Sequence, residues 1–133
     1  MALGEELGEG RGKVTNIRVL PDGKIEVSQQ GTGKLLGSEI SDAATYWTVM
    51  RPNGTAYGEG QQAIMSGDGS AVWKGSGVGK PIGQGGGWRY AVAGAFQTVT
   101  SQKWGHLLDV CTVQEYDVDQ NQNYHWKIWE WKY

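Results

Sequence analysis

The sequence predicts an all-β fold, an eight-stranded antiparallel β-barrel that closes on itself. Two observations support this prediction. Clusters of turn-forming residues recur between runs rich in valine, threonine and aromatic residues, which is the pattern of successive β-hairpins. The 22 glycines are spread through these runs rather than gathered in a linker, and glycine within a strand marks a bend or a close backbone approach.

Eight segments have the composition of strands: residues 13–20, 24–30, 45–50, 55–65, 70–79, 88–100, 112–118 and 125–132. Turn signals such as Pro52-Asn53-Gly54 and Gly67-Asp68-Gly69 separate them. Only residues 101–109 could form a short helical turn, and Gly105 weakens even that. Because an antiparallel sheet must protect its edge strands, and closure removes them, we expect residues 1–133 to form a single closed barrel.

Pairs of glycines recur with one residue between them, at positions 8 and 10, 31 and 33, 58 and 60, and 75 and 77. Side chains alternate along a strand, so both glycines of a pair face the same side of the sheet. We expect these pairs to let the sheet coil tightly, or to let a tryptophan of a neighbouring strand lie across the gap.

Composition excludes several classes of function. The net charge is −2 with both signs mixed along the chain, whereas a nucleic-acid binder shows a basic stripe. No apolar run is long enough to span a bilayer, and the first residues do not resemble a secretory signal. The single cysteine, Cys111, cannot form an internal disulfide. These features together predict a cytoplasmic protein.

Motifs for cofactors, metals and catalysis are missing. No glycine cluster has the spacing of a phosphate-binding loop, and His106, His125 and Cys111 do not have metal-ligand spacing. We therefore expect no cofactor and no metal, and we assign no catalytic residue.

The hairpin of residues 45–61 is more informative. Trp47 and Arg51 share one face of its first strand, and Tyr57 and Glu59 share one face of its second. If these faces coincide inside the barrel, charged groups lie among aromatic rings, as in a ligand cavity. The alternative is a solvated cross-strand pair of Arg51 and Glu59. The candidate ligand-binding residues are Trp47, Arg51, Glu59, Trp73, Arg89, Tyr90 and Glu115.

The C-terminal segment, residues 126–133, carries aromatic side chains on both faces of the expected strand. A strand with one face in water does not need aromatic residues on both. We therefore expect the outer face to contact another copy of the chain, forming a homo-oligomer.

Residues 58–79 contain a Gly-x-Gly strand, a turn and a glycine-rich strand, and they resemble the middle strands of allene oxide cyclase-like (calycin-type) barrels. The full pattern, with the hairpin of residues 46–60 and the closing strand, is also similar to uncharacterised small prokaryotic proteins. The resemblance implies an eight-stranded, often oligomeric barrel of a kind used by cyclases, dirigent proteins and small-molecule binders. No catalytic residue of those cyclases can be matched to a position of this sequence.

Three functions stay open at this point. The first is binding of a small apolar or amphipathic molecule in the barrel lumen. The second is a cyclase or isomerase of the allene oxide cyclase type, in which Glu59 or Glu115 polarises a reactive intermediate. The third is a homo-oligomeric structural or interaction module.

Overall fold

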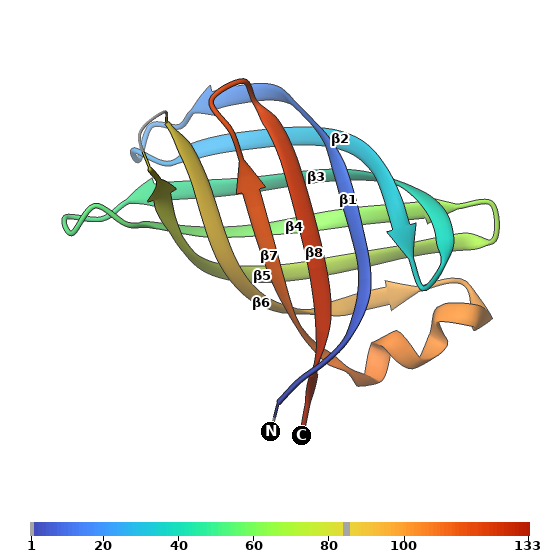
Figure 1. The fold of residues 1–133 in the computed structure, drawn as a ribbon. Helices are drawn as coiled ribbons and strands as arrows, with labels where there is room; N and C mark the ends of the chain where they lie inside the picture. Colours follow the sequence, from blue (N-terminus) through green and yellow to red (C-terminus); the bar gives the residue numbers. More distant parts are fainter. Residues whose placement is uncertain (1, 84–85) are drawn as a thin grey trace.

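The chain forms a closed barrel of eight antiparallel strands, each paired with the next, and the last pairs with the first. Figure 1 shows the sheet wrapping around until β1 and β8 lie side by side. The structure is a computed structural model that describes residues 2–83 and 86–133. The strands are β1 (Ala2–Val19), β2 (Ile25–Leu35), β3 (Ser38–Met50), β4 (Ala56–Ser66), β5 (Gly69–Ile82), β6 (Gly87–Val99), β7 (Cys111–Val118) and β8 (Asn123–Lys132).

The predicted fold class is confirmed, including the single short helical segment, a 3-10 helix η1 (Gln102–Asp109) between β6 and β7. Four strands, β1, β2, β3 and β5, extend several residues beyond the ranges that the sequence indicated, and β1 extends the furthest. β1 begins at Ala2, in a Glu- and Gly-rich segment that has low strand propensity. It is held there by pairing with β8 and, from Gly8 onward, with β2.

The glycine pairs face the barrel interior and lie opposite one another on neighbouring strands. Gly10 pairs with Gly33 and Gly12 with Gly31 across β1 and β2, and Gly58 pairs with Gly77 and Gly60 with Gly75 across β4 and β5. Large rings occupy the space that side chains would fill. A Cβ atom on Gly10 would lie 2.6 Å from the Trp126 ring, and one on Gly94 would lie 2.6 Å from the Trp73 ring. The expectation that a tryptophan lies across such a gap is confirmed.

One end of the barrel is closed by η1, which Figure 1 shows lying across the ends of the strands. Its Trp104 and Leu107 are fully buried and pack into the hydrophobic core with Leu35, Ile64 and Ile128. Removing these large apolar side chains from water stabilises the closed end.

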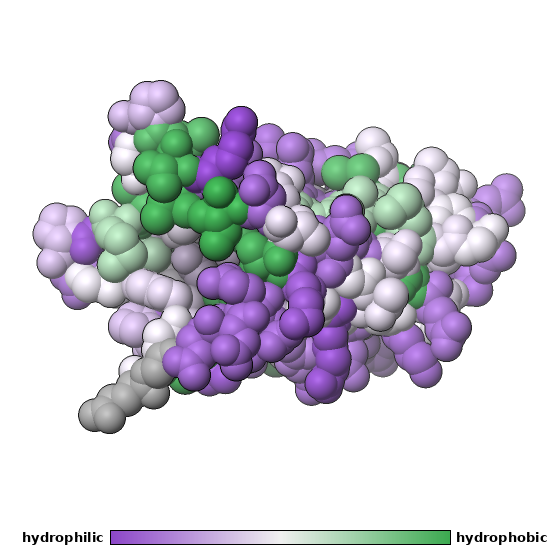
Figure 2. Space-filling model, turned by 90° about the horizontal axis from the view of Figure 1, so that it is seen from above, coloured by the Kyte–Doolittle hydropathy of each residue, from purple (hydrophilic) through white to green (hydrophobic). Residues whose placement is uncertain are grey.

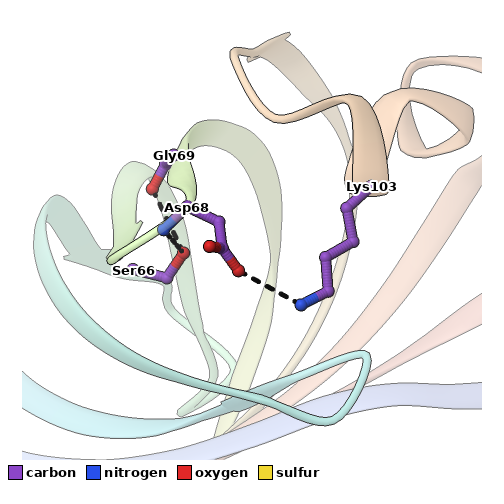
Figure 3. Close-up of polar contacts among 4 residues, drawn as sticks. All are labelled: Ser66, Asp68, Gly69 and Lys103. Carbon is purple, nitrogen blue, oxygen red and sulfur yellow. Dashed lines mark hydrogen bonds and ion pairs between the residues drawn. The ribbon is translucent and has the colours of Figure 1, made fainter.

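Polar contacts fasten η1 to the β4–β5 turn (Figure 3). Lys103 Nζ lies 3.2 Å from Asp68 Oδ2. The turn itself is held by Ser66, whose hydroxyl accepts a hydrogen bond from the Asp68 backbone N–H at 3.1 Å and donates to the Gly69 carbonyl oxygen at 3.4 Å. Both partners of the ion pair are more than half exposed, so the tight packing of Trp104, and not this pair, secures the helix.

The opposite end of the barrel, the mouth, carries the turns of residues 20–24, 51–55 and 119–122. Several apolar side chains near it remain in contact with solvent. Val19 is 79% exposed, Met50 56%, Ile17 48% and Ile82 39%. Figure 2 shows hydrophobic side chains gathered at this end of the molecule.

Candidate ligand-binding site

The mouth contains a pocket of about 290 Å³. Ile25, Val27 and Met50 on one side and Trp88 and Val118 on the other give it largely apolar walls. Tyr46, Thr48 and Tyr90 also line it and bring hydroxyl groups. The Thr48 and Tyr90 hydroxyls form a hydrogen bond of 2.8 Å, so the polar atoms of this pocket are few and partly fixed, as in small-molecule sites.

A second, smaller cavity of about 60 Å³ lies against the interior wall of the barrel. Tyr46 and Tyr90 line both spaces, and their ring centroids are 6.1 Å apart. The inner cavity is lined further by Gln29, Gln62, Gln114, Trp73 and Tyr116. Its volume holds a few water molecules at most.

Four tyrosines fill the middle of the lumen: Tyr46, Tyr90, Tyr116 and Tyr124. Tyr116 contacts the other three, with ring centroids 5.5 Å from Tyr46, 6.0 Å from Tyr90 and 5.9 Å from Tyr124. The Tyr116 hydroxyl donates to Gln29 Oε1 and lies 3.3 Å from the Tyr46 hydroxyl. The lumen is therefore packed with rings over most of its length, and the tyrosine hydroxyls are joined by hydrogen bonds.

Asp42 is the carboxylate that the fold places inside the barrel, where its residue is only 3% exposed. Its Oδ2 atom accepts hydrogen bonds from Gln62 Nε2 at 3.2 Å and from the Tyr124 hydroxyl at 3.0 Å. Its Oδ1 atom has no hydrogen-bond partner in the described part of the chain. The Trp126 indole N–H is near enough to influence the carboxylate, but it does not reach hydrogen-bond geometry.

Burial shifts the pKa values of these groups. Desolvation raises the pKa of Asp42 above its ordinary value, although the hydrogen bonds from Gln62 and Tyr124 oppose that shift. Burial also raises the pKa of Tyr46 to about 12. The pKa values of Tyr90, Tyr116 and Tyr124 are raised in the same direction, primarily by desolvation. At neutral pH the tyrosines are uncharged donors and acceptors.

Of the residues that the sequence singled out, Trp73 and Tyr90 lie inside the barrel, 5% and 6% exposed. The Trp73 indole N–H donates to Thr112 Oγ1 at 2.8 Å, and that hydroxyl donates to the Gly94 carbonyl oxygen. This bond fixes the ring against the wall of the inner cavity.

Of the other five candidates, four lie at strand positions whose side chains point away from the lumen, and the fifth lies in a turn. Trp47 packs on Tyr57, with Lys24 Nζ 4.3 Å from its ring centre, and Glu59 accepts a hydrogen bond from the Tyr57 hydroxyl at 3.1 Å. Arg89 forms two hydrogen bonds with Asp117, of 2.7 and 3.0 Å. Arg51 donates to Thr55 in the β3–β4 turn, and Glu115 is exposed. Glu59 is also among the residues that line the inner cavity, at an outward position between Gly58 and Gly60.

Sequence reasoning missed most of the polar lumen, namely Tyr46, Tyr116, Tyr124, Asp42, Gln29, Gln62 and Gln114. The signal that could have identified them is the position of the glycines in the strand pairing, because the glycines mark the inward face. On β4, Gly58 and Gly60 face inward, and they pair with Thr48 and Tyr46. Residues that pair directly across a sheet point to the same face, so the inward face of β3 carries Tyr46 and not Trp47.

The aromatic residues of β8 divide between the two faces as the sequence indicated. Trp126 is 1% exposed inside the barrel, whereas Trp131, on the other face, is 36% exposed. That the outer face contacts a second copy of the chain stays a prediction. Sedimentation velocity at low protein concentration tests it, and a strict monomer would remove it.

Residues 2–83 and 86–133 contain no group of three or more His, Cys, Asp or Glu side chains placed to hold a metal ion. Within the same residues, no helix has the length and apolar character needed to cross a membrane.

Comparison with known proteins supports the fold. No protein-family model and no curated protein matches the sequence. Among solved structures, a protein with unknown function from Clostridium acetobutylicum superposes with a TM-score of 0.80 at 12% identity, covering 99% of this chain and 100% of the other. A conserved protein of unknown function from Rhodopseudomonas palustris superposes with a TM-score of 0.75 at 10% identity, over 98% and 99% of the two chains. The chain shares their fold. At these identities the likeness shows the fold alone.

Proposed function

We propose that this protein binds a small amphipathic molecule at the mouth of the barrel. The apolar part of the molecule lies in the pocket between Met50, Trp88 and Val118. The observation that carries the proposal is the contrast between the two ends. η1 fills the closed end with Trp104 and Leu107, while the mouth has an apolar pocket of about 290 Å³.

The sequence suggested binding in the barrel lumen, and the proposal places the apolar part of the ligand at the mouth of that lumen. Small-molecule pockets are on the order of 300–1,000 Å³, and the inner cavity of about 60 Å³ is far smaller. The mouth pocket is close to the lower end of that range. Its exposed apolar residues also fit a ligand that enters from solvent, since a surface of this kind marks a binding site.

The proposal is tested by the binding of Nile red, a neutral apolar dye, to wild type and to two matched variants. Met50→Lys places a charge in the mouth pocket, and Met65→Lys places the same charge at the exposed end of β4, near η1. We expect Met50→Lys to abolish the fluorescence increase and Met65→Lys to leave it unchanged. Equal binding by both variants, or no binding by wild type, contradicts the proposal. Native mass spectrometry of freshly purified protein then identifies any molecule that the barrel retains.

The cyclase or isomerase alternative needs a carboxylate in the cavity, and the geometry supports it less well. Glu115 is exposed on the outer face, and Glu59 is bonded to Tyr57. Asp42 is inside the barrel, but its Oδ2 atom already accepts hydrogen bonds from Gln62 and Tyr124. It is also not among the residues that line either cavity. The relationship to allene oxide cyclase-like barrels, proposed from residues 58–79, is compatible with binding as well as with catalysis.

A further inference from the structure

We infer that the bound molecule carries a neutral polar end group that both donates and accepts a hydrogen bond, a hydroxyl or a primary amide, and that this group enters the inner cavity between Tyr46 and Gln114. The inference rests on the proposed function, because it describes the other end of a molecule whose apolar part lies in the mouth pocket. It is supported by the hydrogen-bonding groups that the inner cavity leaves unused.

The first unused group is a donor. Gln114 is 8% exposed and lines the inner cavity, and its Nε2 atom has no hydrogen-bond partner among the residues that the structure describes. A buried amide N–H without a hydrogen-bond partner is unfavourable, because it has lost its hydrogen bond to water. A ligand oxygen at this position would remove that cost.

The second unused group is an acceptor. The Tyr116 hydroxyl donates its only proton to Gln29 Oε1, so in the contact between Tyr46 and Tyr116 the proton must come from Tyr46. The Tyr46 oxygen therefore keeps its lone pairs, and no group in residues 2–83 and 86–133 donates to it. A ligand that fits both groups accepts from Gln114 and donates to Tyr46.

Charge decides which end groups could form these hydrogen bonds with Gln114 and Tyr46. Neither cavity is lined by a lysine, arginine or histidine, so a carboxylate or phosphate would be buried without a counter-charge. A primary ammonium would also lack a partner inside the barrel. Asp42 is occupied by Gln62 and Tyr124 and does not line the cavity. Glu59 lines the cavity only from an outward position on β4, and its carboxylate accepts a hydrogen bond from Tyr57. Neutral end groups lose the least hydration free energy on leaving water.

The test compares octanamide, octanol, octanoate and octylamine at neutral pH, with binding measured by saturation-transfer NMR and titration. Octanamide and octanoate have nearly the same shape and differ in charge and in the donor N–H. We expect octanamide and octanol to bind, and octanoate and octylamine to bind at least about tenfold more weakly, since each would place an unpaired charge in a buried site.

Two variants test the polar contacts separately. Gln114→Met keeps the length of the side chain and removes the donor, and we expect it to weaken octanamide binding roughly three- to tenfold, the value of one hydrogen bond. Tyr46→Phe removes the acceptor and should weaken binding by a similar factor, which keeps the test decisive if Gln114→Met fails to fold. Gln30→Met, at an exposed position of β2, is the matched control and should bind as wild type.

The outcomes separate this inference from the proposed function. If octanoate binds as tightly as octanamide, or if both Gln114→Met and Tyr46→Phe bind octanamide as wild type does, the end-group inference is overturned and the mouth site stands. If Nile red binds in a Met50-dependent way but neither octanamide nor octanol binds, the inference is again overturned. If Nile red does not bind either, the proposed function itself fails.

Discussion

The hydroxyl of Tyr124 donates a hydrogen bond to Asp42 Oδ2 over 3.0 Å, although the two residues are 82 positions apart in the sequence. Tyr124 lies on β8 and Asp42 on β3, and the paired glycines Gly12 and Gly31 lie between them on β1 and β2. The tyrosine crosses two strands because neither has a side chain in its path. A Cβ atom on Gly12 would lie 2.6 Å from the Tyr124 hydroxyl.

Replacing one of these glycines should destabilise the barrel. In Gly31→Ala the new methyl group would overlap both the Arg11 carbonyl oxygen and the Tyr124 hydroxyl. We expect the free energy of unfolding to fall by about 1–3 kcal/mol, the usual cost of overpacking, as measured by urea denaturation. Gly105→Ala in η1 is the control, because nothing lies within 4 Å of its added Cβ atom. An unchanged free energy of unfolding for Gly31→Ala would contradict the packing described here.

The buried carboxylate should make the stability depend on pH in a defined direction. The pKa of Asp42 is raised in the folded state above its ordinary value of 3.8. The contribution of Asp42 to the free energy of unfolding is therefore fully present below pH 3.8, the ordinary pKa. It is lost as the pH rises through the higher pKa of the folded state. In Asp42→Asn the amide oxygen can still accept from Gln62 and Tyr124. We expect this variant to lose that part of the pH dependence and to gain stability relative to wild type at neutral pH, measured by urea denaturation across the acidic range. A wild-type pH profile retained by Asp42→Asn would contradict the assignment.

The lumen tyrosines should ionise only when the barrel opens. Burial raises the pKa of Tyr46 to about 12 from its ordinary value of 10.0. Its contribution to stability is therefore fully present below pH 10.0 and is lost as the pH rises through about 12. An alkaline titration can follow tyrosinate absorbance and far-UV circular dichroism together. We expect the rise in absorbance at the highest pH, from the lumen tyrosines, to coincide with loss of the circular dichroism signal of the β-sheet. Ionisation of all the tyrosines while the sheet remains intact would be the contrary result.

The closed end should owe its stability to packing rather than to charge. Trp104 is 0% exposed in the core, so Trp104→Ala should lower the free energy of unfolding by about 3–5 kcal/mol. Lys103→Ala breaks the exposed ion pair with Asp68 and should cost less than about 1 kcal/mol. Thermal and urea unfolding of the two variants compare these values directly. Similar losses for both variants would show that the ion pair contributes more than its exposure indicates.

The strands and most turns could be predicted from the sequence because their signals are local. Residues 51–55 and 119–123 combine the residues that turns require, and they are turns in the structure. The β2–β3 turn was missed. It consists of Leu36 and Gly37, both with positive φ, 49° and 81°. Leucine rarely adopts that conformation, so the dipeptide carries no ordinary turn signal. Here the pairing of β2 with β3 imposes the turn.

The candidate site was harder to predict, because it depends on which face of each strand points inward. Tyr46 and Trp47 are neighbours, and a shift of one residue in the register exchanges their environments. The sequence pattern favoured Trp47 and Glu59, whereas the structure places Tyr46 in the lumen opposite Gly60. Contacts such as that of Tyr124 with Asp42 bring together residues that are 82 positions apart in the chain, and no local pattern records such a contact.

The glycine rows and the mouth turns lie in different parts of the sequence. The rows govern how tightly the sheet coils and where the rings stack, whereas Gly23 and Gln122 in the turns help to shape the opening. Under the proposed function, substitutions in the turns of residues 20–24 and 119–122 would alter ligand selection while leaving the scaffold intact. If the mouth binds a ligand as proposed, exchange of these short loops, far from Trp104 and η1, would be a route to a new specificity.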